Sequence, residues 1–224
     1  MRGAESSLRR AGRRALIGMA TLLVAGALAV TSSAGGPGPA GRGSRADAAT
    51  PTPPNSSYGI VDAAGGVMTF GGAAYSGDTI GYTLAKPIVG ATANPGGGYW
   101  LVASDGGIFA FGGAQFWGST GGLRLNKPIV AMAATGDGGG YWLVASDGGI
   151  FAYGDAQFYG STGAIALNKP IVGMAATPDG AGYWLVASDG GIFAYGDAQF
   201  YGSTGAIQLN KPIVGMAATP DGAG

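Results

Sequence analysis

The chain has 224 residues, including 47 glycines but no Cys and no His, and its formal net charge is zero. Without Cys and His, disulfides, thiolate metal sites and most acid–base or nucleophile arrangements are excluded. Residues 1–57 hold seven Arg against two acids (net +5), whereas residues 58–224 hold five basic residues against ten Asp (net −5), so we expect no nucleic-acid-binding surface on the main body.

Residues 1–34 have the pattern of an export signal. Five arginines precede the apolar run ALIGMATLLVAGALAV (15–30), and small residues offer a cleavage site at either Ala27-x-Ala29 or Ser32-x-Ala34. The run is shorter than the about 20 residues that span a bilayer. This favours a cleaved signal over an uncleaved anchor, through either the general or the twin-arginine route. We therefore predict a secreted or cell-surface protein that contacts the membrane only if the segment stays uncleaved.

Residues 35–57 are rich in Gly, Pro, Ala, Ser and Thr and hold almost no large apolar side chain. Such a segment cannot bury enough apolar surface to form a core. It is predicted to be a disordered linker.

The rest of the chain repeats with a period of about 42 residues. The four units are 58–98, 99–140, 141–182 and 183–224, and the last two are nearly identical. A period of this length indicates stacked supersecondary units, none of which can bury its own faces alone. The first unit diverges, because Gly59 stands where the later units have Trp.

Each unit contains four short apolar runs separated by turn residues. In the third unit these are YWLVAS (141–146), GIFAYG (149–154), AQFYGS (156–161) and PIVGMAAT (170–177). Their length, their β-branched and aromatic content and the intervening Asp-Gly turns predict strands rather than helices. Apolar residues occupy both faces of the first run, as in a sheet buried between blades. We predict an all-β protein built as a β-propeller with four-stranded blades; a β-solenoid is the alternative.

The stretch IVGMAATPDGAGYWLVASDGGIFAYG resembles the strand pattern of bacterial β-propellers of the WD40-like and kelch-like kind. It lacks the Gly-His and Trp-Asp signatures of true WD40 repeats. It also resembles an uncharacterised YWLVASDGGIF repeat of secreted bacterial proteins, which sometimes stands beside cell-wall hydrolase domains. The resemblance covers residues 58–224 and implies no defined activity.

In a propeller, PIVGMAAT would be the innermost strand and AQFYGS the outermost. The last inner strand (212–219) could complete the first blade and close a four-bladed ring. The alternatives are a homodimer that completes an eight-bladed ring, or an incomplete array from a longer protein.

Two sets of residues are candidates for ligand binding. One lysine per unit precedes each inner strand, and a ring of these could attract an anionic wall polymer; solvation of a strand end is the simpler explanation. Aromatic pairs in AQFYGS and its equivalents could stack on sugars, beside Gln amides, although packing between blades is favoured. The candidate site residues are Lys86, Lys127, Lys169, Lys211, Trp117, Tyr159 and Tyr201.

We predict no catalytic activity, no cofactor and no metal. The Asp residues recur at turn positions in several units, and Asp-Gly is common turn chemistry, so a turn role is favoured over Ca²⁺ binding. The predicted function is a non-catalytic binding scaffold for cell-wall or extracellular polysaccharide. The alternatives are a structural or protein-interaction repeat that binds an extracellular protein, or a piece of a longer exported protein with a hydrolase domain.

Overall fold

A computed structural model describes residues 57–222. The predicted signal (1–34) and nearly all of the predicted linker (35–57) lie outside the described residues. Eleven strands and no helix form in the described part, which therefore contains no helix able to span a membrane. The strands are β1 (Tyr58–Val61), β2 (Val67–Phe70), β3 (Ile88–Ala93), β4 (Tyr99–Ala103), β5 (Ile108–Phe111), β6 (Ile129–Ala134), β7 (Gly140–Ala145), β8 (Ile150–Gly154), β9 (Ile171–Ala176), β10 (Gly182–Ala187) and β11 (Ile192–Gly196).

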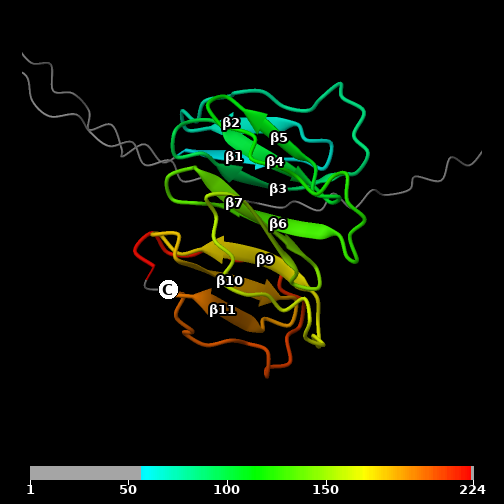
Figure 1. The fold of residues 1–224 in the computed structure, drawn as a ribbon, viewed down its shortest axis with the longest axis vertical. Helices are drawn as coiled ribbons and strands as arrows, with labels where there is room; N and C mark the ends of the chain where they lie inside the picture. The colour runs from blue at the N-terminus through cyan, green and yellow to red at the C-terminus, as the bar shows by residue number, and fades with distance from the viewer. Residues whose placement is uncertain (1–56, 223–224) are drawn as a thin grey trace, which may run out of the picture.

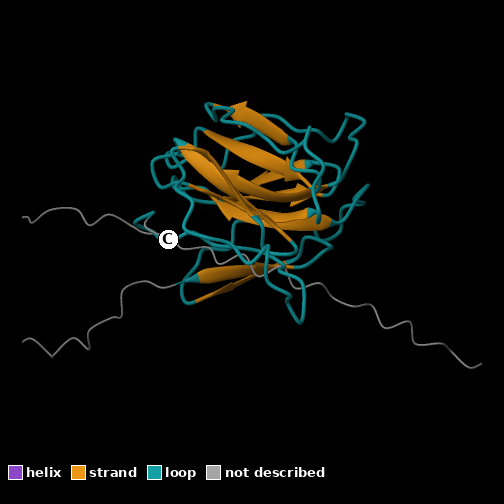
Figure 2. Ribbon diagram, turned by 90° about the horizontal axis from the view of Figure 1, so that it is seen from below, coloured by secondary structure: helices purple, strands orange, loops and turns teal. Residues whose placement is uncertain are grey.

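The strands form four small antiparallel sheets, β1-β2, β3-β4-β5, β6-β7-β8 and β9-β10-β11. Figures 1 and 2 show these sheets stacked face to face along the chain. Within residues 57–222, each sheet is built from consecutive strands and no ladder joins strands of successive sheets, so the β-solenoid alternative is excluded there. The arrangement is an incomplete β-propeller, as the strand pattern predicted.

The inner strands lie side by side, with β3 beside β6 and β6 beside β9. Small residues permit this approach. A Cβ built on Gly173 of β9 would stand 3.3 Å from the Cα of Gly215 in the next unit, tighter than ordinary van der Waals contact. The predicted placement of PIVGMAAT at the crowded inner edge is therefore confirmed.

The middle strand of each three-stranded sheet is buried on both faces. In β7, every residue from Gly140 to Ala145 is buried. Tyr141 packs against Trp100 of the preceding sheet, with ring centroids 5.5 Å apart, and Trp142 packs against Tyr183 of the following sheet at 5.7 Å. Alternate side chains thus face opposite neighbours, and the core of the protein is the set of interfaces between successive sheets.

The turn between the middle and outer strands explains the repeated Asp-Gly. The carboxylate of Asp147 accepts the Gly149 N–H at 3.0 Å, and Gly148 has φ +79°, a left-handed conformation that favours glycine. Thr162 closes the turn from outside, since its hydroxyl donates to the Asp147 carbonyl at 3.1 Å. The predicted turn role of these aspartates is confirmed.

Two predictions about strands require correction. The run AQFYGS (156–161) forms no strand, and β8 is the outermost strand of its sheet. Three of the blades therefore have three strands and the first has two, in place of the predicted four. The segment 212–219 also forms no strand, and β1 pairs only with β2. The ring is thus not closed within the described chain, and the predicted closure of a four-bladed ring by the segment 212–219 is wrong.

Candidate binding surfaces

The segment after β8 passes between two successive sheets, and for this reason it does not add a strand to its own sheet. The indole N–H of Trp142 donates to the Gln157 carbonyl at 2.7 Å. From the next sheet, the hydroxyl of Tyr183 donates to the Gly160 carbonyl at 2.6 Å and accepts the Tyr159 N–H at 3.2 Å. Backbone groups that would have joined a ladder are instead bonded to side chains of both flanking sheets.

This tyrosine contact recurs along the array. The Tyr141 hydroxyl bonds to Gly118, and that of Tyr99 to Gly77. Burial raises the pKa of Tyr141 and Tyr183 above the ordinary value of 10.0, although the backbone N–H donors oppose the shift. The phenols are therefore neutral donors at physiological pH. Their role is to join successive repeats, and sequence reasoning did not find it.

The aromatic pairs of these segments divide into a packed ring and an exposed ring. Tyr159 is half-buried against the Tyr183 ring, with centroids 5.8 Å apart, and its hydroxyl donates to the Gly180 carbonyl at 3.1 Å. Trp117 donates in the same way to the Gly138 carbonyl at 3.3 Å. The adjacent phenylalanines, Phe116, Phe158 and Phe200, are 60%, 62% and 61% exposed.

Tyr201 differs from its two equivalents. It is 60% exposed, against 38% for Trp117 and a half-buried Tyr159. No repeat follows it in the described chain to supply the tyrosine ring that Tyr159 contacts. Trp117 and Tyr159 thus lie between repeats, whereas Tyr201 belongs to the last described repeat. A sugar-binding role for all three stays a prediction.

The exposed phenylalanines form what we call the phenylalanine rim, Phe116, Phe158 and Phe200. Each is preceded by an exposed glutamine, Gln115, Gln157 or Gln199. The amide groups of Gln157 and Gln199 donate within their own loops, to the carbonyls of Asp155 and Asp197. The amide oxygens are acceptors beside each exposed ring.

The lysines lie on the loops that lead into the inner strands. Lys86, Lys127, Lys169 and Lys211 are all exposed, one in each successive loop. These loops share a face with the Asp-Gly turns, because the Ser146 N–H donates to the Pro128 carbonyl and the Ile171 N–H to the Ser146 carbonyl, both at 2.9 Å. Beside Lys86 there is a shallow depression lined by Ala63, Ala64, Tyr82, Leu84 and Pro87. Anion binding by the lysines stays a prediction.

The opposite face carries aspartates in pairs. The Thr135 hydroxyl lies 2.9 Å from an oxygen of Asp137 and 3.1 Å from one of Asp155. The Gly139 N–H and the Thr135 hydroxyl lower the pKa of Asp137. The Thr177 hydroxyl likewise donates to Asp179 at 2.9 Å, and Asp197 lies beside Gly182 as Asp155 lies beside Gly140. Within the described residues, no group of three carboxylate, His or Cys side chains could hold a metal ion.

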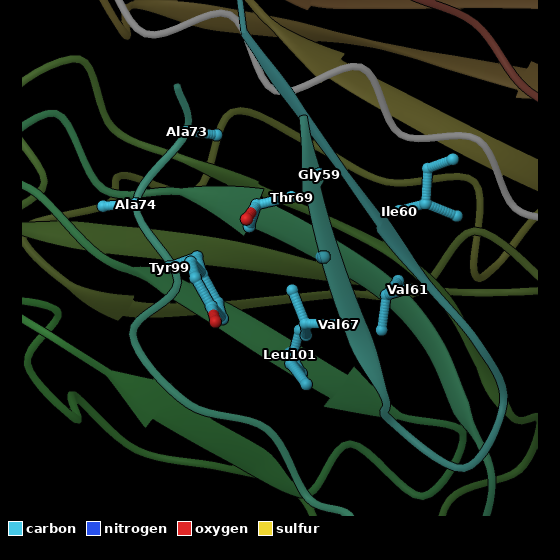
Figure 3. A pocket seen from close by; sticks show the side chains of 10 residues that line it. Gly59, Ile60, Val61, Val67, Thr69, Ala73, Ala74, Tyr99 and Leu101 are labelled. Carbon is cyan, nitrogen blue, oxygen red and sulfur yellow. The ribbon is translucent and has the colours of Figure 1, made fainter. Parts of the chain in front are cut away.

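A small cavity of about 30 Å³ lies between the first two sheets. Figure 3 shows Tyr99 and Leu101 facing Val67 and Thr69 across it, with Ile60 directed away. The cavity lies where two large side chains are missing. Gly59 replaces the tryptophan of the other units, and Ala91 lines the cavity at the position that Met132 and Met174 hold.

Comparisons with known proteins add the following. No family model matches the chain, and no curated protein matches it significantly. Among solved structures, it is similar to the β-propeller domain of Cps50 (Swd1) from Myceliophteria thermophila, with a TM-score of 0.45 and 9% sequence identity. The match covers 74% of this chain and 56% of that chain, so this chain spans little more than half of that domain.

Proposed function

We propose that the protein is an exported, non-catalytic binding scaffold whose phenylalanine rim binds cell-wall or extracellular polysaccharide. The observation that carries this proposal is the regular exposure of one phenylalanine ring in each of the last three repeats, at 60–62% of its surface. Exposed aromatic faces stack on the apolar faces of sugar rings, and adjacent amides bond to their hydroxyls. A periodic polymer would meet the same phenylalanine ring and glutamine amide in successive repeats.

Export supports the same function. The apolar run at 15–30 follows clustered arginines, which is the composition of an export signal. A protein delivered beyond the cytoplasmic membrane meets wall polymers and extracellular glycans.

The test is a sedimentation binding assay of the full chain with purified peptidoglycan and with neutral polysaccharide particles. The triple variant Phe116→Ala, Phe158→Ala, Phe200→Ala should bind at least tenfold more weakly. The matched control replaces Lys127, Lys169 and Lys211 with Ala, and it should bind as the original chain does. Equal binding by the phenylalanine variant and the original chain would refute the rim as the site.

If the lysine variant alone loses binding, and binding to anionic polymer falls with salt, the lysine face is the site instead. Either failure rejects the proposed rim.

A second candidate function is supported by the sheet edges. β5, β8 and β11 are the outermost strands of their sheets, and no strand in the described chain pairs with their outer edges. An extended segment of another protein can add to such an edge through backbone hydrogen bonds. Amide exchange distinguishes the two functions, because polysaccharide would leave the outer-strand amides unchanged whereas an added strand would protect them.

A further inference from the structure

Every lysine in the repeats stands directly before a proline. The four pairs in residues 58–224 are Lys86-Pro87, Lys127-Pro128, Lys169-Pro170 and Lys211-Pro212. A trypsin-type endopeptidase cuts after a basic residue, but it cuts poorly before proline, because the proline ring fixes φ and makes the nitrogen of the bond tertiary. The four lysines are all exposed, yet none of them offers such a protease a bond that it readily cuts.

The remaining basic residue of the repeats, Arg124, is different, because leucine follows it. It is the single arginine of residues 58–224. Arg124 lies in the connection between β5 and β6, outside any strand, and residues 121–124 and 126–128 are all exposed. Exposed loops of small and polar residues are preferred sites of proteolytic cleavage. The chemistry of the residue and its place in the fold thus both suit cleavage.

Few contacts hold this loop against the body of the protein. Within it, the Leu123 N–H donates to the Thr120 carbonyl at 2.8 Å. The half-buried Leu125 packs against the cluster between the second and third sheets. Opening the segment around Arg124 therefore disrupts little buried surface, and local openings of this kind need far less free energy than global unfolding. A protease can draw the segment into its cleft while the sheets stay folded.

The loop is fixed at both ends. Before it, the buried Thr120 donates through its hydroxyl to the Asp105 carbonyl at 3.0 Å. After it, the buried Ile129 donates through its backbone N–H to the Ser104 carbonyl at 2.9 Å. The two ends of a cut loop therefore stay in place on the turn between β4 and β5.

The other three loops have equivalent anchors but lack the arginine. The positions that correspond to Arg124 are exposed and hold Thr83, Ala166 and Gln208. One kind of loop thus occurs four times in the described residues, and only one copy carries a residue that a trypsin-type protease recognises at this position.

We propose that the Arg124–Leu125 bond is a processing site, at which a trypsin-type serine endopeptidase cuts the array once. A carboxylate in the specificity pocket of such a protease pairs with the Arg124 guanidinium. Water hydrolyses the amide: the bond between the Arg124 carbonyl carbon and the Leu125 nitrogen breaks, Arg124 gains a carboxylate and Leu125 gains a free amino group. No group is oxidised or reduced. The proposal does not rest on polysaccharide binding.

The cut falls between sheets and leaves every ladder whole. The strands β1 to β5 stay in one piece and β6 to β11 in the other. Trp100 of the first piece packs against Tyr141 of the second, with ring centroids 5.5 Å apart. The Tyr141 hydroxyl also donates to the Gly118 carbonyl of the first piece at 2.7 Å. Processing therefore breaks the chain without taking the array apart.

Limited digestion of the full chain with trypsin, followed by N-terminal sequencing of the products, tests the proposal. Within residues 58–224, the expected result is one new N-terminus, at Leu125. The other seven arginines lie at residues 2–45, outside the described residues, and cuts after them give N-termini no later than Ala46. Arg124→Gln, which introduces the residue found at 208, should be cut in the repeats at least tenfold more slowly. A folded chain that is not cut after Arg124, or that is cut equally fast after a lysine, would overturn the proposal.

Two variants in the third repeat test each half of the reasoning. Ala166→Arg places an arginine at the equivalent position of another loop, and it should create a second new N-terminus at Leu167. Pro170→Ala removes the protection of Lys169 but keeps the carbonyl that accepts the Ser188 N–H at 2.9 Å, so cutting should appear after Lys169. No cut in Ala166→Arg would show that these loops do not admit the protease. No cut in Pro170→Ala would show that the prolines are not what protects the lysines.

The state of the cut protein is measured by size-exclusion chromatography. The two pieces should elute together in native buffer and separate in concentrated urea. Arg124→Gln, carried through the same digestion, is the matched control and should elute as one chain in both solvents. Pieces that separate without urea would refute the retained assembly.

Discussion

Replacing Trp142 with Ala tests whether the interfaces between sheets hold the protein together. The side chain is fully buried in the cluster between the third and fourth sheets. It contacts the ring of Tyr183 and bonds through its indole N–H to the Gln157 carbonyl at 2.7 Å. Few substitutions remove so much packing at one interface while leaving the strand pairing intact.

The expected loss of unfolding free energy is about 3–5 kcal/mol, the usual cost of removing a large buried aromatic side chain. Within that total, the ring contact with Tyr183 accounts for about 0.5–1.5 kcal/mol, and the indole hydrogen bond for about 1 kcal/mol. The matched control is Trp184→Ala. Trp184 is also buried and bonds to the Gln199 carbonyl at 2.6 Å, but no tyrosine of a following repeat lies beside it in the described chain. Its loss should be smaller by about the ring contribution.

The assay is equilibrium denaturation in urea, followed by circular dichroism at a concentration where the chain is a single copy. Stacked repeats can unfold in more than one step, so the unfolding of each interface is fitted separately. A loss below about 1 kcal/mol for Trp142→Ala, or a larger loss for Trp184→Ala than for Trp142→Ala, would refute the reasoning.

Further predictions concern the cavity, the tyrosine contact and pH. Ala91→Met restores the residue of the later units beside the cavity and should raise the unfolding free energy by about 0.5–2 kcal/mol; a lowered urea midpoint would contradict it. Tyr183→Phe leaves the Gly160 carbonyl and the Tyr159 N–H without their partner, and it should lower the unfolding free energy by about 1–3 kcal/mol. Tyr58→Phe, at an exposed position, should lower it by less. Burial raises the pKa of Tyr183 above 10.0. The neutral phenol therefore stabilises the fold below pH 10, and this contribution is lost as pH rises through the pKa of the folded state. A urea midpoint that stays constant over that pH range would argue against this prediction. The Gly139 N–H and the Thr135 hydroxyl lower the pKa of Asp137 from 3.8. The stability that ionised Asp137 contributes is therefore present above pH 3.8 and is lost as pH falls through the pKa of the folded state. Asp137→Asn should flatten the acid limb of stability measured against pH, and an unchanged limb would count against this prediction.

The repeat and three of its four apolar runs could be predicted as strands from the sequence. Each of these runs lies between turn residues whose roles are local. The carboxylate of Asp147 bonds only two residues away, so the information that ends β7 lies beside it. Such local signals can be read without knowing the tertiary structure.

The fourth run was predicted wrongly because its backbone partners are distant. AQFYGS has the composition of a strand, but side chains that are distant in sequence bond to its backbone. Trp142 donates to the Gln157 carbonyl, 15 residues later, and the Tyr183 hydroxyl accepts the Tyr159 N–H, 24 residues earlier. Propensity gives way to such tertiary contacts. One signal in the sequence indicates these contacts. Tyrosine, and not phenylalanine, recurs at positions 99, 141 and 183, although phenylalanine would fill the same volume; the retained hydroxyl indicates a hydrogen bond at each position.

The sequence predicted the aromatic pairs, but not which ring of each pair is exposed to solvent. In Phe158-Tyr159, two adjacent side chains point in different directions, and the sequence does not say which faces the next repeat. The hydroxyl decides it, because Tyr159 can bond to the Gly180 carbonyl and phenylalanine cannot. In the Phe116-Trp117 and Phe158-Tyr159 pairs, the more exposed ring is therefore the one without a polar group.

The missing tryptophan at Gly59 also has a mechanical consequence. If the chain is tethered at one end and pulled from the other, the load passes through the interfaces between sheets in series. The interface between the first two sheets holds a cavity where the others hold an indole, so it is the weakest part of the array under tension. In a single-molecule pulling experiment, we expect the first extension step to release the 41-residue first unit at a lower force than the later units. A first step of a different length would show that the load finds another weak point.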